Sequence, residues 1–456
     1  MERYRSITRN LCEFIEASPT GYHVIDNAER MLREKGFIPL AEYERWDLKP
    51  GQAYYVNRSG SSMIAFVLPE GMPSGYQIIA SHSDSPAFKI KESPEISKAG
   101  HYVVLNVEKY GGMLQRPWFD RPLGIAGRIC VLKDGRIKTV LVDSGKDLVM
   151  IPSLAIHMDR KANESGQISV QSDMLPVFGD EAAAGKFAEL TAAQAGVDPQ
   201  DIIGMDLFLY NRSPYSFWGA DGEFFSSPRL DDQMCAYASV NAIINTWEEK
   251  RNDLSGISIC CIFDNEEVGS GTKQGADSTF LSDTLKRIRI AEGLSEEEHM
   301  MLLASSFMLS ADNSHAVHPN YIDKADPVNR PLMNHGVVIK WNAAQKYTTD
   351  AVSASVFRAI CRKNDIPVQD YVNNADIPGG STLGNISAAH VSVNCVDIGC
   401  AQLAMHSPYE TAGVMDTLYM IQAMEAFYKT SIRMTKEEPD EQKKQLCEEN
   451  NITLIE

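Results

Sequence analysis

The sequence lacks the features that mark membrane-spanning, secreted and nucleic-acid-binding proteins. Its longest apolar runs are strand-sized and interrupted by charge, so we expect no membrane span. The first residues, Met-Glu-Arg-Tyr-Arg, contain no apolar stretch of the kind found in secretory signals, and a cytoplasmic location is expected. No basic block stands out among 43 basic and 61 acidic residues, and the net charge of −18 argues against nucleic acid as a partner.

Cysteine is present but is not arranged for disulfides or for a zinc ribbon. The nine cysteines are an odd number, form no Cys-x-x-Cys pair and mostly lie in apolar runs, which predicts reduced thiols in a core. Hydrophobic residues make up 44 % of the chain and charged residues 23 %, as is usual for a globular enzyme. A length of 456 residues exceeds what one core usually serves, so we expect two domains.

The most informative stretch is an apolar run that ends in two adjacent glutamates. Residues 257–263 include β-branched residues and are too few for a typical helix, which predicts a buried strand. Glu266 and Glu267 follow, at the end of a strand where open α/β sheets bind their ligands. One carboxylate can hold a metal ion while its neighbour transfers protons. A solvated acidic turn is the alternative, and it would be favoured if the pair were isolated.

Similar junctions between an apolar run and polar side chains recur along the chain. One run is followed by His82 and Asp84, another by Asp312, and a third by His406. A histidine two residues before an aspartate suits a ligand imidazole with a carboxylate that fixes its tautomer. Each junction is weak evidence by itself, because a single histidine is more often structural than ligating.

Two further aspartates, Asp231 and Asp232, stand at the start of a predicted helix with an apolar stripe. An aspartate at a helix N-cap is common, so a capping role is the simpler interpretation. Two aspartates side by side allow one to cap the helix while the other faces a cation.

Taken together, the ends of these segments supply two imidazoles and three carboxylates. Such mixed ligands suit Zn²⁺, Mn²⁺ or Co²⁺, and five are too many for one tetrahedral site. Two ions that share a carboxylate fit better, as in hydrolases that use a metal pair to lower the pKa of a bridging water. Glu266 would be the general base that passes the proton to the leaving amine. The predicted ligands are His82, Asp231, Glu267, Asp312 and His406.

The pattern of apolar and polar residues differs between two outer segments and the part that they enclose. Residues 1–90 and 224–456 contain helical patterns and buried strands, whereas residues 91–223 mostly alternate apolar and polar positions. We interpret the enclosed part as an inserted β-rich domain. Within it, His157 ends an apolar segment, and the residues alone favour a packed or hydrogen-bonded core role for it.

Five segments in order carry specific motifs: Ser-His-Ser-Asp-Ser-Pro (81–86), Ser-Pro-Arg-Leu-Asp-Asp (227–232), Phe-Asp-Asn-Glu-Glu-Val-Gly-Ser (263–270), Ser-Ala-Asp-Asn-Ser-His-Ala-Val-His-Pro-Asn-Tyr (310–321) and Gln-Leu-Ala-Met-His-Ser (402–407). The set resembles the M18 metalloaminopeptidases, the aspartyl aminopeptidase family, from about residue 8 to residue 428. The resemblance implies one metal ion on His82, Asp231 and Asp312, and a second on Asp231, Glu267 and His406.

The resemblance also implies roles for residues around the ligands. Glu266 would be the base, and Asp84 would support the first ligand histidine. The segment Ile-Pro-Ser-Leu-Ala-Ile-His (151–157) is similar to a loop that reaches a neighbouring subunit's active site, so His157 would help to stabilise the transition state there. His315 and His318 are similar to the family's structural histidines.

For the fold, the resemblance implies an α/β protein. Its mixed-sheet dimetal peptidase domain (1–90 and 224–456) would have helices on both faces and be interrupted by a β-rich dimerisation domain (91–223). Dimers that build tetrahedral dodecamers are expected from the same likeness.

The expected substrates are peptides with a free N-terminus. Lys340 stands where acidic-preferring members of the family place a lysine in the first side-chain pocket, and Tyr347 follows nearby. A lysine suits an Asp or Glu side chain, so an acidic preference is predicted. Three alternatives stay open: a Leu-type neutral preference, a dimetal amidohydrolase acting on another amide, and a catalytically silent assembly. The intact ligand set with Glu266 speaks against the last.

Overall fold

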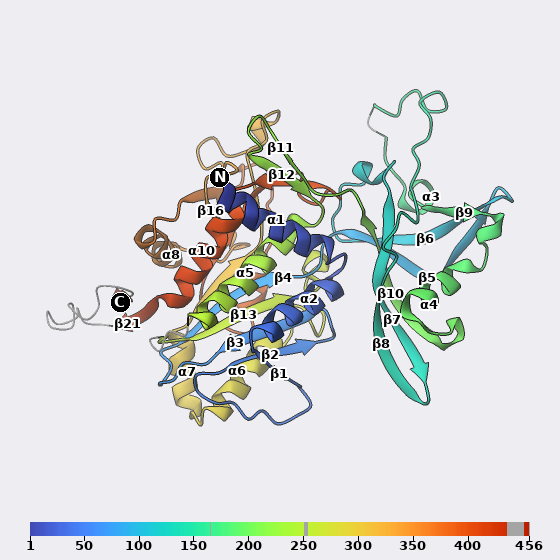
Figure 1. Ribbon diagram of the computed structural model, residues 1–456. Coiled ribbons are helices and arrows are strands. Elements are labelled where there is room, and N and C mark those ends of the chain that lie inside the picture. Colours follow the sequence, from blue (N-terminus) through green and yellow to red (C-terminus); the bar gives the residue numbers. More distant parts are fainter. Residues whose placement is uncertain (165, 250–253, 436–450, 456) are drawn as a thin grey trace.

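The chain is built around a nine-stranded mixed sheet, shown in Figure 1. The computed structural model describes residues 1–164, 166–249, 254–435 and 451–455. The strands of this sheet are β1 (Ile38–Leu40), β2 (Ala53–Arg58), β3 (Ser62–Val67), β4 (Tyr76–His82), β13 (Ile257–Phe263), β14 (Phe307–Ala311), β16 (Val337–Trp341), β17 (Val368–Val372) and β18 (Asn394–Gly399). Their order across the sheet is β1-β2-β3-β13-β4-β14-β18-β16-β17.

The centre of the sheet is parallel. β4 pairs in parallel with β13 and β14, and β14 pairs in parallel with β18. Antiparallel neighbours, β3 and β16, flank this group. Every residue of β13 is buried, which confirms the buried strand predicted for residues 257–263. Strands that are apolar on both faces need cover on both sides.

Helices supply that cover on both faces. Successive strand residues point to opposite faces, so Ile79, Cys260 and Leu309 join one core, while the neighbouring Ile78, Cys261 and Met308 join another. The first core contains α1 (Glu2–Glu16), α2 (Gly21–Glu34), α5 (Leu230–Glu248), α8 (Ala351–Lys363) and α10 (Asp416–Lys429). The second contains α6 (Phe280–Ala291), α7 (Glu296–Ala304) and α9 (Leu383–Ser387). The predicted mixed α/β fold is thereby confirmed.

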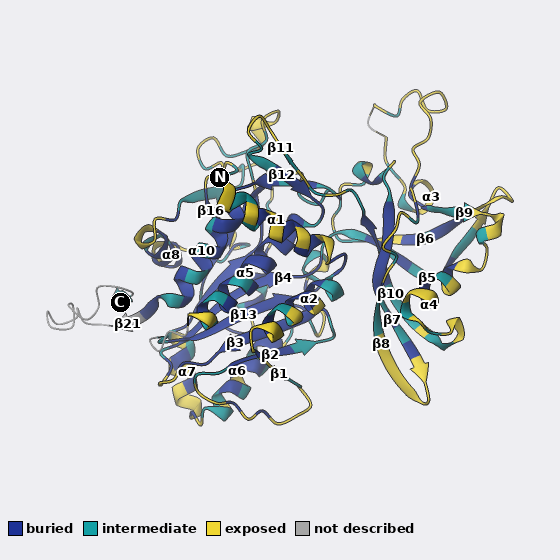
Figure 2. Cartoon of the chain, in the orientation of Figure 1, coloured by how far each residue is buried: buried dark blue, intermediate teal, exposed yellow. Residues whose placement is uncertain are grey.

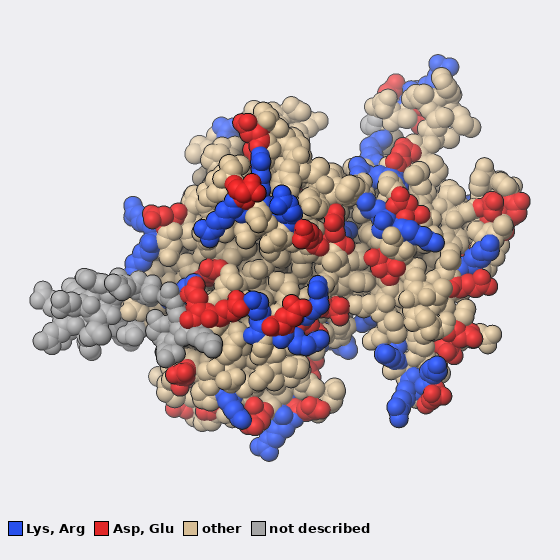
Figure 3. Space-filling view, in the orientation of Figure 1, with Lys and Arg blue, Asp and Glu red and all other residues tan. Residues whose placement is uncertain are grey.

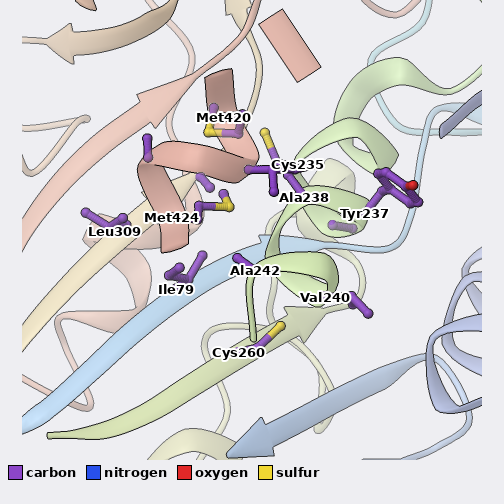
Figure 4. Close-up of a cluster of buried hydrophobic side chains, with 14 of the residues drawn as sticks. Ile79, Cys235, Tyr237, Ala238, Val240, Ala242, Cys260, Leu309, Met420 and Met424 are labelled. Carbon is purple, nitrogen blue, oxygen red and sulfur yellow. The ribbon is translucent and has the colours of Figure 1, made fainter. Parts of the chain in front are cut away.

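Figure 4 shows how the first core packs. Side chains of the strands face Cys235, Ala238 and Ala242 of α5 and Met420 and Met424 of α10. The alanines let α5 approach the sheet closely, and Figure 2 shows the dark blue, buried centre that results. This packing holds α5 against strands β4 and β13.

A second, six-stranded antiparallel sheet forms a separate lobe on the right of Figure 1. Its strands are β5 (Ala87–Lys98), β6 (Tyr102–Tyr110), β7 (Leu123–Lys133), β8 (Arg136–Asp143), β9 (Val177–Asp180) and β10 (Ile202–Asn211), in the order β8-β7-β10-β5-β6-β9. Helices α3 (Val170–Asp173) and α4 (Lys186–Ala195) belong to this lobe, which has its own hydrophobic core. These strands span residues 87–211, which is close to the range 91–223 predicted for the inserted domain. The domain boundaries at 91 and 223 stay a prediction.

The remaining strands form two small sheets. One is ordered β11-β12-β20-β19-β15, and the other pairs β21 with β22 in parallel. Their bounds are β11 (Ser216–Trp218), β12 (Phe224–Ser227), β15 (Ser314–His315), β19 (Ala401–Leu403), β20 (Glu410–Gly413), β21 (Ser431–Thr435) and β22 (Asn451–Ile455). Short 3₁₀ helices are η1 (Arg116–Trp118), η2 (Glu181–Ala183), η3 (Pro199–Asp201), η4 (Glu266–Val268) and η5 (Ile322–Lys324).

None of the helices within the described residues has the length and apolarity that crossing a membrane requires. All eight cysteines in the described ranges are free and seven are buried, as predicted for core thiols, while Cys447 lies outside those ranges. Figure 3 shows basic and acidic side chains interspersed over the face in view.

Candidate metal centre

Three of the predicted ligands lie at the carboxyl ends of neighbouring parallel strands. His82 is the last residue of β4, Glu267 lies in η4 a few residues after β13, and Asp312 follows β14 directly. The register pairs His82 with Phe263, so the ends of β4 and β13 are level. Parallel strands present their carboxyl ends at one edge of a sheet. The residues that end or follow β4, β13 and β14 therefore meet at that edge, although they are far apart in the sequence.

Asp231 and His406 complete the cluster from other elements. Asp231 lies at the start of α5 but outside helical geometry, with φ −85° and ψ 109°. The carboxylate of Asp232 accepts a hydrogen bond from the backbone N–H of His82 (3.2 Å). No side-chain hydrogen bond caps the start of α5 among the described residues, so the capping interpretation is wrong: Asp231 faces the cluster, and Asp232 links α5 to β4.

The geometry joins all five predicted ligands through Asp231. Its Oδ1 is 3.5 Å from His82 Nε2, and its Oδ2 is 3.4 Å from His406 Nε2. His82 Nε2 is also 4.0 Å from Oδ1 of Asp312, and His406 Nε2 is 3.3 Å from Oε1 of Glu267. Three groups have ligand atoms within 4.8 Å of one another, and Asp231 belongs to two of them: one with His82, Asp312 and its neighbour Asp232, the other with Glu267 and His406.

The side chains fit divalent cations. Oδ1 of Asp231 and Oε1 of Glu267 are buried and have no hydrogen-bond partner within the described part of the chain, which is costly for carboxylate oxygens unless a cation meets them. The Nδ1 atoms of His82 and His406 each face a backbone carbonyl, of Asp84 (3.0 Å) and of Gly112 respectively. Each Nε2 is thereby left as the atom that points to the cluster.

Asp84 does more than support a histidine. Its Oδ1 accepts from the backbone N–H of Glu266 and its Oδ2 from that of Glu267, both at 3.1 Å. Its carboxylate is 3.4 Å from Nδ1 of His82. The Tyr110 hydroxyl donates to Oδ2 as well (2.7 Å). One carboxylate thus fixes the 3₁₀ turn η4 that carries both glutamates.

Glu266 lies beside the cluster and has an altered acidity. A ligand atom of Glu266 groups with those of His82 and Glu267 within 4.8 Å. Burial raises the pKa of Glu266 to about 8, and the carboxylates of Asp312 and Asp84 add to the rise. A group with this pKa can accept a proton and return it near neutral pH.

Glu410 is a site residue that the sequence reasoning missed. It is 1 % exposed, its Oε2 accepts from the backbone N–H of Asp231 (3.0 Å), and its Oε1 accepts from that of His406 (2.7 Å). Burial raises the pKa of Glu410 to about 8. It has no motif of its own, and only its position four residues after His406 could have pointed to it.

The cluster lines a cleft of about 320 Å³. Lys340 and Tyr347 are on its wall, and their role in binding substrate stays a prediction. Lys340 is 2 % exposed, and its ammonium lies 2.7 Å from the carbonyl oxygen and 3.3 Å from Oδ2 of Asp312. Burial alone would lower the pKa of Lys340, but Asp312 and Tyr347 raise it above its usual value, so the ammonium stays charged.

The other predicted histidines lie in different surroundings. His315 lines the cleft and packs edge-on against Tyr371, with ring centroids 5.9 Å apart, and burial lowers its pKa. His318 packs against Tyr321, and its Nδ1 accepts from the backbone N–H of Asn320 (3.2 Å). A structural role for both stays a prediction, although the position of His315 in the cleft wall also allows contact with substrate.

His157 is exposed, so the core role that the residues alone favoured is wrong. It lies on the long connection between β8 and α3, which projects from the six-stranded lobe in Figure 1. Its neighbours Leu154, Ile156 and Met158 are exposed too, Met158 by 76 %. Exposed apolar side chains in a row are typical of a surface that meets another chain.

A mixed sheet covered by helices, with a buried His and carboxylate cluster at the ends of its parallel strands, defines an α/β metallohydrolase. The model of the family described as Aminopeptidase I zinc metalloprotease (M18) matches residues 14–428. The chain belongs to this M18 family and is an aminopeptidase.

Individual relatives agree with the family assignment. The chain is 42 % identical to the probable M18 family aminopeptidase 2 of Clostridium acetobutylicum over 436 residues, covering 94 % of this chain and 100 % of the relative. It is 37 % identical to that of Pseudomonas aeruginosa over 434 residues, covering 93 % and 98 %.

Solved structures show the same fold. Ape4, from a complex with Nbr1, superposes with a TM-score of 0.89 at 34 % identity, covering 93 % of this chain and 86 % of that one. A chain of the S. cerevesiae mApe1 dodecamer superposes with a TM-score of 0.83 at 28 % identity, covering 94 % and 97 %.

Proposed function

We propose that this aminopeptidase removes the N-terminal residue of peptides at a pair of divalent cations, with Glu266 as general base. The observation that carries the proposal is the position of Asp231, whose two carboxylate oxygens face two different histidines. A carboxylate shared in this way is the arrangement that a two-metal hydrolase requires.

The distances in the cluster are compatible with two ligand sets that share Asp231. His82, Asp231 and Asp312 would hold one cation, and Asp231, Glu267 and His406 the other. Imidazole with carboxylate suits Zn²⁺ best among common metals, with Mn²⁺ or Co²⁺ as alternatives. When bound, the pair would supply Lewis acidity that polarises the scissile carbonyl and makes a water molecule more acidic.

Glu266 would move the proton. It would take the proton from the attacking water and deliver it to the leaving amine. Asp84 would keep Glu266 in place through the backbone N–H bond at 3.1 Å.

The acidic preference is proposed on the charge of Lys340. Among the described residues that line the cleft, it is the one lysine or arginine. Its pairing with Asp312 favours the alternative, a neutral preference, because the ammonium already has a carboxylate partner. The two preferences predict different ratios of the cleavage rates of acidic and neutral substrates.

We further propose that the chain self-associates into dimers and a tetrahedral dodecamer, in which His157 reaches the cleft of a neighbouring subunit. The exposure of residues 152–158 in the chain and the dodecameric state of S. cerevesiae mApe1 support this proposal.

The substrate proposal is tested with free and N-acetylated dipeptides and with Asp-, Glu- and Leu-anilides. Free dipeptides should be cleaved and acetylated ones should not, and the Asp and Glu anilides should be preferred. In Lys340→Ala the acidic preference should disappear. Cleavage of the acetylated peptides would indicate an amidohydrolase instead. A Leu preference in the wild type would remove the acidic assignment alone.

A further inference from the structure

A segment of the six-stranded lobe reaches the metal centre. Strand β6 ends at Tyr110, whose hydroxyl donates to Oδ2 of Asp84 (2.7 Å) and accepts from Nδ2 of Asn265 (2.9 Å). The hydroxyl therefore links Asp84 to the residue that precedes Glu266. No sequence motif marked Tyr110, because its partners are far away in the chain.

The residues after Tyr110 touch the centre as well. The carbonyl of Gly112 accepts from Nδ1 of His406, and the backbone N–H of Leu114 donates to the carbonyl of His406 (3.0 Å). Gly111 has φ +79°, and a Cβ there would lie 3.2 Å from Cβ of Glu267. The backbone at Gly111 thus packs directly on a predicted ligand, so residues 110–114 contact both sides of the cluster.

The position of Asp84 determines where both glutamates lie. Its two oxygens accept the backbone N–H groups of Glu266 and Glu267, and hydrogen bonds to a carboxylate are stronger than neutral ones. Tyr110 donates to the oxygen that also receives Glu267. Burial, followed by the charge of Asp84, raises the pKa of Tyr110 far above its usual value, so the phenol keeps its proton and donates.

We propose that Tyr110 is a positioning residue for the reaction: through Asp84 it holds η4 so that Glu267 meets the cation and Glu266 meets the water. The inserted lobe would then contribute to the metal centre of its own chain, in addition to any role in assembly. This inference rests on the proposed function. It concerns the chain's own residues and can be tested without turnover.

The chain offers a matched control in Tyr210. Both tyrosines line a cavity of about 60 Å³ between the two lobes. The Tyr210 hydroxyl donates to Oδ1 of Asp143 (2.6 Å) and accepts from Arg212 (3.1 Å), so it also joins one carboxylate and one N–H donor. Asp143 belongs to β8 and is not part of the cluster. Each Tyr→Phe change therefore removes one hydroxyl that bonds a carboxylate. The changes differ in that carboxylate, which is Asp84 beside the cluster for Tyr110 and Asp143 away from it for Tyr210.

The experiment compares Tyr110→Phe, Tyr210→Phe and the wild type, all as the full chain. It measures kcat and KM on a free dipeptide at saturating zinc, zinc affinity by chelator competition, and thermal unfolding. Tyr110→Phe should lose about 10–100-fold in kcat with KM changed less than about threefold, and zinc affinity should fall about tenfold or more. Tyr210→Phe should match the wild type in kcat and zinc affinity.

Two results would overturn the inference. One is a Tyr110→Phe variant with wild-type kcat and zinc affinity. The other is an equal loss in Tyr210→Phe, which would indicate a general effect of the cavity. Failure of the proposed function would look different, because the wild type itself would then not release N-terminal residues, while zinc affinity would still report on Tyr110.

Discussion

Asp231 connects the two halves of the cluster. One of its oxygens faces His82 and the other faces His406, while its backbone N–H is held by the buried carboxylate of Glu410. The residue that we propose as the shared ligand is thus held by its main chain as well as directed by its side chain. A fixed ligand loses less freedom when it binds a cation, which favours affinity.

At the level of single residues, Glu266→Gln tests the general base. The amide cannot accept the proton, but the five ligands stay in place. We expect kcat to fall about 10²–10⁴-fold with metal content unchanged, measured by mass spectrometry of bound metal and by steady-state kinetics. The exposed Glu297→Gln serves as the control and should keep full activity. Near wild-type turnover in a metal-loaded Glu266→Gln would refute the role.

Sequence reasoning found the residues of the cluster and Asp84, but missed other residues that hold the cluster in place. His82, Glu267 and Asp312 each follow an apolar run, which is a local signal. Glu410, Tyr110 and the carbonyl of Gly112 have no such signal, because they act through contacts between distant segments.

At the level of elements, the site depends on how closely strand ends approach one another. Gly399 ends β18 beside the residue that follows β14, and a Cβ on Gly399 would lie 2.1 Å from the carbonyl of Asp312. The same carbonyl accepts from Lys340. Only a residue without a side chain allows this approach.

Gly399→Ala should therefore displace Asp312. We expect a loss of about 1–3 kcal/mol in unfolding free energy, measured with denaturant, because the added methyl group overpacks a buried contact. Zinc affinity should fall as well, measured by chelator competition. Gly71→Ala is the matched control, since a Cβ there meets no atom within 4 Å. An unchanged zinc affinity in Gly399→Ala would contradict the link between this contact and the site.

The elements themselves could be predicted only in part. The buried strand at residues 257–263 and the helical stripe after Asp232 are visible in residue patterns, and both exist as β13 and α5. The order of strands across the nine-stranded sheet could not be predicted, since pairing β13 between β3 and β4 requires contacts of roughly 200 residues' separation.

At the level of the whole molecule, one part of the six-stranded lobe contacts the metal centre of its own chain and another part projects away from it. Residues 110–114 contact the cluster of the same chain, whereas the connection that carries His157 projects outward (Figure 1), and His157 on it is exposed. The texture of the sequence indicated an insertion, but the residues alone gave the wrong role for His157, because an apolar run can serve a core or an interface between chains.

Mixed oligomers test whether His157 acts in a neighbouring subunit. His157→Phe and Glu266→Gln should each be nearly inactive alone. Co-expressed, they should recover about a quarter of wild-type activity, because half of randomly paired dimers are mixed and each mixed dimer has one complete site of two. Activity is measured on purified mixed oligomers. No gain over the separate variants, or full activity of His157→Phe alone, would show that His157 does not complete a neighbour's site.

The most direct test of the whole account is anomalous scattering by zinc in crystals of the zinc-loaded enzyme. The account predicts two zinc peaks, one among His82, Asp231 and Asp312 and the other among Asp231, Glu267 and His406. A single peak, or peaks away from these side chains, would contradict it.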